Sequence, residues 1–286
     1  MFNTRSKRYL LLISILSVLI LLVVGLQSGL RRSLRNFANP DGPVYTGNYR
    51  KEKPDFDGPI KVVTWNISFS KQIDEAIKTL EEVEALRDAD ILLLQEMDAK
   101  GVEEIAKALS YEYVYYPASI HRRHGKEFGE AILSKWPILS HSKIVLPNSV
   151  PGINQTRIAV KANVLVNDVE IAVYNTHLET VWMLQIWADT QVDHLADIIG
   201  LEDGAVILGG DFNSWSETSI TTLEEKFGAL GLDRVSKGTE YTFVYRGLSL
   251  IMDHIFARGA SAYDAGVWRE TDVSDHYPIW GILNFK

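Results

Sequence analysis

The chain of 286 residues contains no cysteine. It therefore has no disulfide framework, no thiolate metal site and no cysteine nucleophile, and redox chemistry does not indicate its compartment. It also contains no repeat of fixed period. A hydrophobic content of 46% and a charged content of 23% are ordinary for a globular protein, and the length suits one large α/β domain or two small ones.

Basic residues are scarce in most of the chain. Residues 1–54 hold nine Lys or Arg and two acidic residues, which leaves 20 basic against 35 acidic residues, a net charge of −15, for residues 55–286. Binding of nucleic acid depends largely on Lys and Arg that neutralise phosphates, and so acidic a region lacks that driving force overall. Acidic clusters are instead what hard divalent cations require.

One long apolar run lies near the N-terminus. Residues 9–26 are almost wholly apolar, and with residues 27–30 they reach the length of a membrane-spanning helix. A cleaved signal peptide is the alternative, but its apolar run is usually shorter, and residues 23–28 offer no convincing cleavage site. We therefore expect residues 1–30 to be an uncleaved signal anchor, with one transmembrane helix that contacts the membrane through residues 9–30.

Three basic residues flank each end of this run, so the positive-inside rule does not decide its orientation. A single N-terminal anchor ahead of a large domain favours an extracytoplasmic position for that domain. Residues 31–59 are rich in Pro, Gly, Asn and Asp and lack periodicity. We expect them to be a linker, followed by a catalytic domain over residues 60–286.

Strands and helices alternate from residue 60 onward. Strands are expected over residues 60–67, 90–96, 111–116, 129–138, 156–166, 169–177, 206–211, 249–257 and within 267–285. Helices are expected over residues 73–86, 102–109, 182–199 and 216–227, and a basic loop over residues 120–126. Many strands with few helices predict an α+β sandwich of two packed sheets with helices outside, rather than a single parallel sheet.

The segment Ile207–Trp215 carries the first chemical signal. A buried run ends in two glycines, which are followed by Asp211, Phe212 and Asn213. Residues two apart on a strand face the same side, so Asp211 and Asn213 would reach one cleft together. A carboxylate beside a carboxamide suits metal-assisted phosphate chemistry, whereas a turn rich in helix-capping residues is the structural alternative.

The same pattern recurs along the chain, because apolar strands end repeatedly in groups that are costly to bury. These groups are Asn66, Glu96, His177, Asp211 with Asn213, Asp253-His254 and Asp275-His276. Each alone has a structural explanation, such as a loop cap, a surface ion pair or a core histidine. One shared site, where carboxylates hold a metal and Asp–His pairs move protons, explains all of them together.

The motifs at these positions resemble, in order, those of the endonuclease/exonuclease/phosphatase superfamily, which includes deoxyribonucleases, abasic-site endonucleases, neutral sphingomyelinases and inositol-polyphosphate phosphatases. They are W-N-I (65–67), L-Q-E (94–96), N-T-H-L-E (175–179), G-D-F-N (210–213), M-D-H-I-F (252–256) and S-D-H-Y-P-I (274–279). The resemblance covers about residues 60–286. It implies a four-layer α/β/β/α sandwich of two mixed sheets flanked by helices.

The resemblance also implies roles for single residues. Glu96 and Asp275 match metal-site carboxylates, and Asn66 matches a residue that contacts metal or phosphate. The remaining matches are catalytic: His177 toward the phosphate, Asp211 toward the attacking water or the leaving group, Asn213 toward the transition-state phosphate, His276 as the catalytic histidine, and Asp253 as its orienting carboxylate. Oxygen ligands favour Mg²⁺, with Mn²⁺ as the alternative, over Zn²⁺.

The resemblance and the residues themselves indicate further roles outside these motif positions. Arg157 is placed near the phosphate by the resemblance, and His254 is expected to be structural. Glu130 departs from the family pattern, because many relatives carry Asn or another neutral residue there. The basic loop over residues 121–126 is either solvated or contacts a substrate phosphate or headgroup.

The predicted function is that of a membrane-anchored, metal-dependent hydrolase of phosphoesters, with phosphodiesters as the first choice. A lipid headgroup suits the anchor, whereas an extracytoplasmic nuclease acting on DNA or RNA is the alternative within the same class. A catalytically inactive binding module is the alternative from another class, but none of the key positions is lost. We predict no protein partner.

Overall fold

The computed structural model describes residues 14–20, 22–23, 36–51, 58–121, 124–148, 155–180 and 185–285. The chain divides into two compact units, Met1–Asn36 and Phe37–Lys286. In the first unit the described residues 14–20 and 22–23 are helical, and their apolar side chains are about half exposed, as at Leu16 (59%). No helix within the described ranges is both long and apolar enough to cross a membrane. Most of the anchor predicted over residues 9–30 lies outside these ranges.

Two mixed β-sheets form the centre of the second unit. The seven-stranded sheet has the order β1 (Tyr45–Asn48), β4 (Glu112–Ile120), β5 (Glu127–Ser134), β3 (Ile91–Met97), β2 (Ile60–Asn66), β15 (Ile279–Phe285) and β14 (Ala260–Val267). The six-stranded sheet has the order β10 (Asp233–Arg234), β13 (Asp253–Arg258), β9 (Ala205–Asp211), β8 (Val169–His177), β7 (Ile158–Val166) and β6 (Ile138–Val145). A short ribbon pairs β11 (Phe243–Tyr245) with β12 (Leu248–Leu250). The β2–β3 and β8–β9 pairs are parallel, which makes both sheets mixed.

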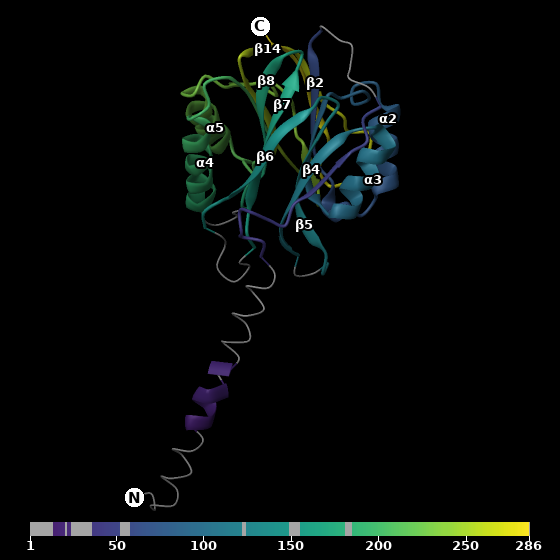
Figure 1. Ribbon diagram of the computed structural model, residues 1–286. Helices are drawn as coiled ribbons and strands as arrows, with labels where there is room; N and C mark the ends of the chain where they lie inside the picture. Colours follow the sequence, from purple (N-terminus) through teal and green to yellow (C-terminus); the bar gives the residue numbers. More distant parts are fainter. Residues whose placement is uncertain are drawn as a thin grey trace, which may run out of the picture. The chain divides into compact units, whose positions relative to one another are not determined.

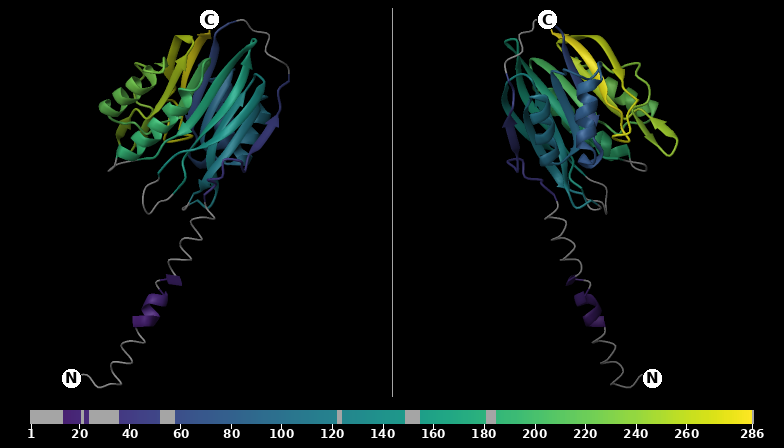
Figure 2. Two further views of the ribbon diagram at one scale, coloured as in Figure 1. Left: turned by 60° about the vertical axis from the view of Figure 1, so that its left-hand side comes forward. Right: turned by 90° about the vertical axis from the view of Figure 1, so that its right-hand side faces the viewer.

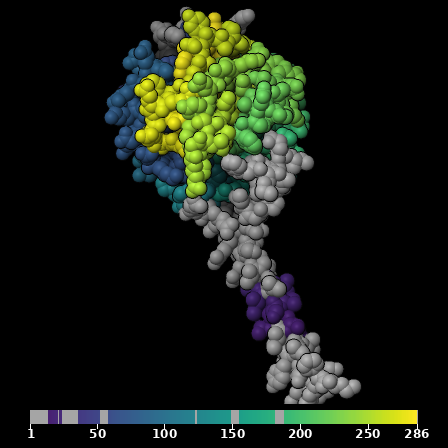
Figure 3. Space-filling view, turned by 180° about the vertical axis from the view of Figure 1, so that it is seen from behind, coloured from purple at the N-terminus to yellow at the C-terminus, as the bar shows by residue number. Residues whose placement is uncertain are grey.

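Helices cover the outer face of each sheet (Figures 1 and 2). The helices α2 (Ile73–Glu82) and α3 (Ala99–Leu109) pack on the seven-stranded sheet, whereas α4 (Gln185–Ile199) and α5 (Glu217–Gly228) pack on the six-stranded sheet. Both α3 and α5 begin at side-chain caps, where Asp98 accepts from the Gly101 amide and Ser216 from the Ser219 amide. Seen from behind, most of the surface belongs to the segments from α4 onward, in green to yellow (Figure 3).

The largest core lies between the two sheets. It is built from β-branched and other apolar residues of β2, β3, β4 and β5 on one side and β7, β8, β9 and β13 on the other. Two further cores lie between each sheet and its helices. The predicted four-layer α/β/β/α sandwich is therefore confirmed for this unit.

Several boundaries differ from those expected, among them two at the edges of the sheets. The segment predicted as a linker, residues 31–59, contains β1, which pairs antiparallel with β4 at the edge of the sheet, so part of it belongs to the folded unit. The single strand expected over residues 129–138 is two strands, β5 and β6, which belong to different sheets. The intervening residues Lys135–Pro137 turn the chain, because Pro137 has no amide hydrogen with which to continue a ladder.

A stability prediction follows from the packing at Gly129, where β5 pairs with both β3 and β4. A β-carbon at this position would lie 2.1 Å from the Tyr116 carbonyl oxygen. We expect Gly129→Ala to lower the free energy of unfolding by about 2–3 kcal/mol, or Tm by about 5–10 °C, since backbone cannot move aside cheaply. Gly204→Ala is the matched control, because nothing lies within 4 Å of its added carbon. Equal melting temperatures for the two variants in a calorimetric scan would contradict the prediction.

Candidate active site

Three of the predicted site residues form one row across the six-stranded sheet. The parallel register of β8 and β9 sets His177 beside Asp211, and the antiparallel register of β9 and β13 sets Asp211 beside Asp253. All three side chains are buried. Backbone pairing therefore fixes which polar groups meet at the strand ends, as the recurring sequence pattern indicated.

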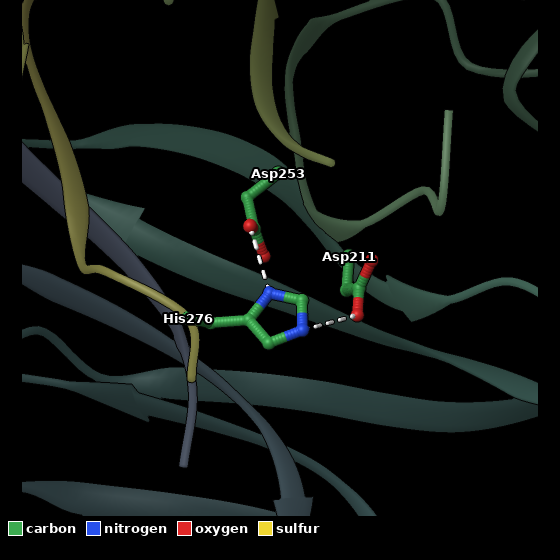
Figure 4. A group of neighbouring side chains, drawn as sticks. All are labelled: Asp211, Asp253 and His276. Atoms are coloured by element: carbon green, nitrogen blue, oxygen red, sulfur yellow. Dashed lines mark hydrogen bonds and ion pairs between the residues drawn. The ribbon is translucent and has the colours of Figure 1, made fainter. Parts of the chain in front are cut away.

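His276 completes this row from the segment that precedes β15 (Figure 4). Its Nδ1 lies 3.0 Å from Oδ2 of Asp253, and its Nε2 lies 3.6 Å from Oδ2 of Asp211. The Asp253 oxygen also accepts a hydrogen bond from Oγ1 of Thr242 at 2.6 Å, and the Trp65 indole donates to the His276 carbonyl at 2.9 Å. The imidazole is thereby held between two carboxylates in one orientation.

These two carboxylates also determine the charge of His276. Burial alone would lower the pKa of this imidazole, but Asp253 and Asp211 raise the pKa to about 10. His276 is therefore a cation at neutral pH. His177 has the opposite character, because burial and the positive charges of Arg157 and His276 hold its pKa well below the usual value.

Asp211 is the point at which the other polar groups converge. Its Oδ2 accepts from Nδ2 of Asn66 at 3.1 Å and lies 3.4 Å from Nε2 of His177, while its Oδ1 accepts from the Asn213 amide at 2.9 Å. Burial raises the pKa of Asp211 to about 6, with His276 acting in the opposite direction. The carboxylate is thus ionised at neutral pH but can take a proton near it.

Asn213 holds the loop after β9 in place. It adopts a left-handed backbone conformation with φ of 50°, and its Nδ2 donates to the Leu178 carbonyl at 2.9 Å. Asparagine tolerates this conformation better than most residues. One amide hydrogen is therefore used in holding the loop after β8, which leaves the second for a ligand.

The predicted metal residues lie on the seven-stranded side of the site. Glu96 occupies a bulge in β3 with φ of 57°, and burial raises the pKa of its carboxyl to about 7. Asp211 and Asp275 add to this rise, which places their charges near Glu96. Asp275 is exposed, and Asn66 turns its Oδ1 to the Ser68 amide at 3.0 Å.

A second group of potential ligands is the trio Asp211, Asp253 and His276, whose ligand atoms all lie within 4.8 Å of one another. Metal ligation requires a neutral imidazole. Nδ1 of His276 already lies 3.0 Å from Asp253, which leaves only its Nε2 for a metal. The trio and the predicted metal residues around Glu96 are thus two separate groups of potential ligands. The raised pKa of Glu96, whose side chain is partly exposed, fits a cation nearby, since a carboxylate held away from water needs a compensating charge.

The remaining sequence predictions are also located. Nη2 of Arg157 lies 3.5 Å from Oε1 of Glu179, next to the site. His254 is buried, its Nε2 lies 2.8 Å from Oγ of Ser214, and burial lowers its pKa to about 3, in agreement with a structural role. Sequence reasoning missed Thr242, because it lies in a short polar segment with no motif.

The basic loop contributes aromatic contacts beside the site. The His121 and His124 rings pack on Phe69, with centroids 4.3 and 4.5 Å from it. Phe128 connects this group to the site, since its ring lies 5.9 Å from His121 and 6.4 Å from His177. A series of rings therefore leads from His177 outward.

Proteins of similar sequence include members named UPF0294. UPF0294 proteins of Vibrio cholerae and Yersinia enterocolitica are each 28% identical to this chain, over 236 and 235 residues. The first alignment covers 80% of this chain and 79% of the relative, and the second covers 77% and 82%.

Solved structures of the same fold include an endonuclease/exonuclease/phosphatase from Beutenbergia cavernae and D. rerio TDP2 complexed with a single-strand DNA product. Their TM-scores are 0.67 and 0.65 at 19% and 20% identity, covering 80% of this chain in both cases and 72% and 100% of those chains. At such identities the likeness establishes the fold. The model of the Endonuclease/Exonuclease/phosphatase family matches residues 63–276, which include every predicted site residue from Asn66 to His276. The chain belongs to the endonuclease/exonuclease/phosphatase family.

Proposed function

We propose that this protein hydrolyses a phosphoester, with a phosphodiester as the first choice, by attack of water at the site around Asp211 and His276. The observation that carries the proposal is the imidazole of His276 held between two buried carboxylates, at 3.0 Å from Asp253 and 3.6 Å from Asp211. The positive charge of His276, at the ends of the buried strands, is suited to binding an anionic substrate. Members of the family are generally hydrolases of phosphoester bonds.

Each residue of the row has a distinct part in this mechanism. Asp253 accepts from Nδ1 of His276, which fixes the ring and leaves the Nε2 hydrogen to face the phosphate and neutralise its charge. Asp211 orients the attacking water and takes its proton, since a base with a pKa of about 6 is matched to neutral pH. Asn66 and His177 steady Asp211, and Asn213 offers its second amide hydrogen to a phosphate oxygen.

A divalent cation, Mg²⁺ or Mn²⁺, would be held by Glu96 with Asn66 and Asp275. When bound, it supplies charge neutralisation at the phosphate oxygens. The carboxyl of Glu96 has the pKa raised by burial that a cation would relieve. The predicted ligands are oxygen atoms, which suits a hard cation.

We further propose a membrane location with an extracytoplasmic site, from the apolar run near the N-terminus. Its described residues are helical and expose apolar side chains, including Ile15, Leu19 and Val23. We propose that residues 9–30 anchor the protein in a membrane and that a phospholipid or glycolipid headgroup is the substrate. The net charge of −15 over residues 55–286 favours this class over nucleic acid.

A nuclease is the second candidate, and the rings near the site favour it. Phe69 and His121 lie on the route outward from His177 through Phe128, and unstacked bases pack on such rings. An inactive binding module has no such support, because the hydrogen bond between His276 and Asp253 is in place.

The test compares substrates and metal dependence on the full chain in detergent. DNA, RNA, sphingomyelin and an inositol phospholipid are each assayed with Mg²⁺ and with EDTA. We expect hydrolysis of a lipid phosphodiester that disappears when the metal is chelated. Cleavage of DNA or RNA alone would favour the nuclease, and the absence of hydrolysis on the whole panel, or activity that survives EDTA, would contradict the proposed mechanism.

A further inference from the structure

Glu130 is a buried carboxylate that the mechanism above does not use. It lies in the middle of β5 with 0% of its surface exposed. Neither of its side-chain oxygens has a hydrogen-bond partner in the described part of the chain. Leaving a buried carboxylate unpaired costs several kcal/mol in general, so this position calls for a compensating group.

The position of Glu130 in the sheet directs it toward the proposed cation site. Its neighbour Ala131 pairs with Leu94 of β3, and Gly129 pairs with Met97, so Glu130 lies opposite the bulge that contains Glu96. Ala131 belongs to the core under α2 and α3, and alternation along β5 therefore turns Glu130 to the other face, between the two sheets. The negative charge of Glu96 reaches Glu130 and adds to the effect of burial, which raises its pKa well above the usual value.

Arg157 is the cation nearest to Glu130 among its electrostatic neighbours, but it is shared with other carboxyl groups. Arg157 interacts electrostatically with Glu96 and Glu130, and its Nη2 lies 3.5 Å from Glu179. One guanidinium thus faces three carboxyl groups, so it cannot pair closely with each of them. Arg157 does not complete the pairing, because its Nε and Nη1 are buried without acceptors within the described ranges.

We propose that Glu130 binds a divalent cation together with Glu96, as an additional ligand of the cation site. This inference rests on the proposed function and adds a residue to its metal site. Carboxylate oxygens are the preferred ligands of a hard divalent cation. The Nε and Nη1 donors of Arg157 then remain available for an anionic group of the substrate. A neutral residue at this position would give a site with weaker affinity for the cation.

Direct binding of Mn²⁺ to the full chain in detergent, followed by electron paramagnetic resonance without substrate, tests the proposal. Glu130→Gln keeps the shape of the side chain but removes its charge. We expect its dissociation constant for Mn²⁺ to rise by about tenfold or more, the size of effect seen when a supporting group of a metal site is removed. Mn²⁺ should also raise the Tm of Glu130→Gln less than it raises the Tm of the unsubstituted protein.

Three further variants make the outcome decisive. Glu130→Asn repeats the test with a smaller neutral side chain, should the glutamine variant fail to fold. Asp90→Asn is the matched control, a buried carboxylate that accepts from the Lys61 amide and the Trp136 indole outside the site, and it should bind Mn²⁺ normally. If both Glu130 variants bind Mn²⁺ as tightly as the unsubstituted protein while Glu96→Gln does not, the proposal is wrong but the proposed function stands. If Glu96→Gln also binds normally, the proposed metal site itself is wrong.

Discussion

Replacing His276 with alanine is expected to lower kcat by about 10³-fold on whichever phosphoester the protein hydrolyses. The imidazole is held in one orientation by Asp253 and carries a positive charge at neutral pH, so its removal takes away both a fixed donor and a charge at the phosphate. KM should change much less, because the interaction strengthens as charge develops on the phosphate. Steady-state kinetics at saturating Mg²⁺ measures both constants.

The charge of His276 can be checked separately from activity. Carboxylates favour the protonated ring, so nitrogen NMR at pH 8 should show both ring nitrogens of His276 protonated, and Asp253→Asn should lower its pKa from about 10. His141→Ala is the control, since this exposed histidine lies on β6 and contacts Tyr116 away from the row. A His276 variant as active as the His141 variant would show that the ring has no part in the reaction.

Asp211→Asn is expected to cause a loss of similar size, about 10³-fold in kcat. Asparagine fills the same space and still accepts from the Asn213 amide, but it cannot take a proton. The pKa of Asp211 is about 6, so activity should rise with pH through that value in the unsubstituted enzyme, because the base must be ionised. The variant should lack this rise. Saturating Mg²⁺ is required, so that protonation of Glu96 does not limit the rate.

The two residues should also behave as one unit. A double variant of Asp211 and His276 is expected to be no less active than the poorer single variant, because each loss already disables the same step. Asp90→Asn again serves as a control for the loss of a buried carboxylate. Additive losses in the double variant, or an unchanged acidic limb in Asp211→Asn, would assign proton transfer to another group.

Sequence predicted the interior of the fold well and its edges poorly. Interior strands such as β2, β8 and β9 carry buried apolar runs that mark them directly. The edge strands β1, β6 and β14 are largely exposed, so no alternation of apolar and polar residues distinguishes them from loops. Their strand character comes from backbone pairing with a neighbour distant in sequence, which composition cannot reveal.

The candidate site shows a similar division. The residues at strand ends were predictable, because polar groups such as Asp211 and His177 interrupt buried runs. Thr242 was not, since its contact with Asp253 depends on how the segment before β11 returns to the sheet. The burial of Glu130 could not be predicted either. A single acidic residue within a strand gives the same sequence pattern whether it faces solvent or the space between the sheets.

The row of His177, Asp211 and Asp253 is positioned by strand pairing, whereas contacts that select a substrate can come from the loops around it. Each member occupies a fixed rung of adjacent strands, so the spacing between them is set by the 4.7–4.9 Å interval of β-sheets in general rather than by loops. The connections that follow these strands can change beyond Leu178 and Asn213 without altering that interval. A laboratory selection for new substrates should therefore succeed through insertions beyond Leu178 and Asn213, and fail through any insertion within β8 or β9, which would shift the rungs that follow it.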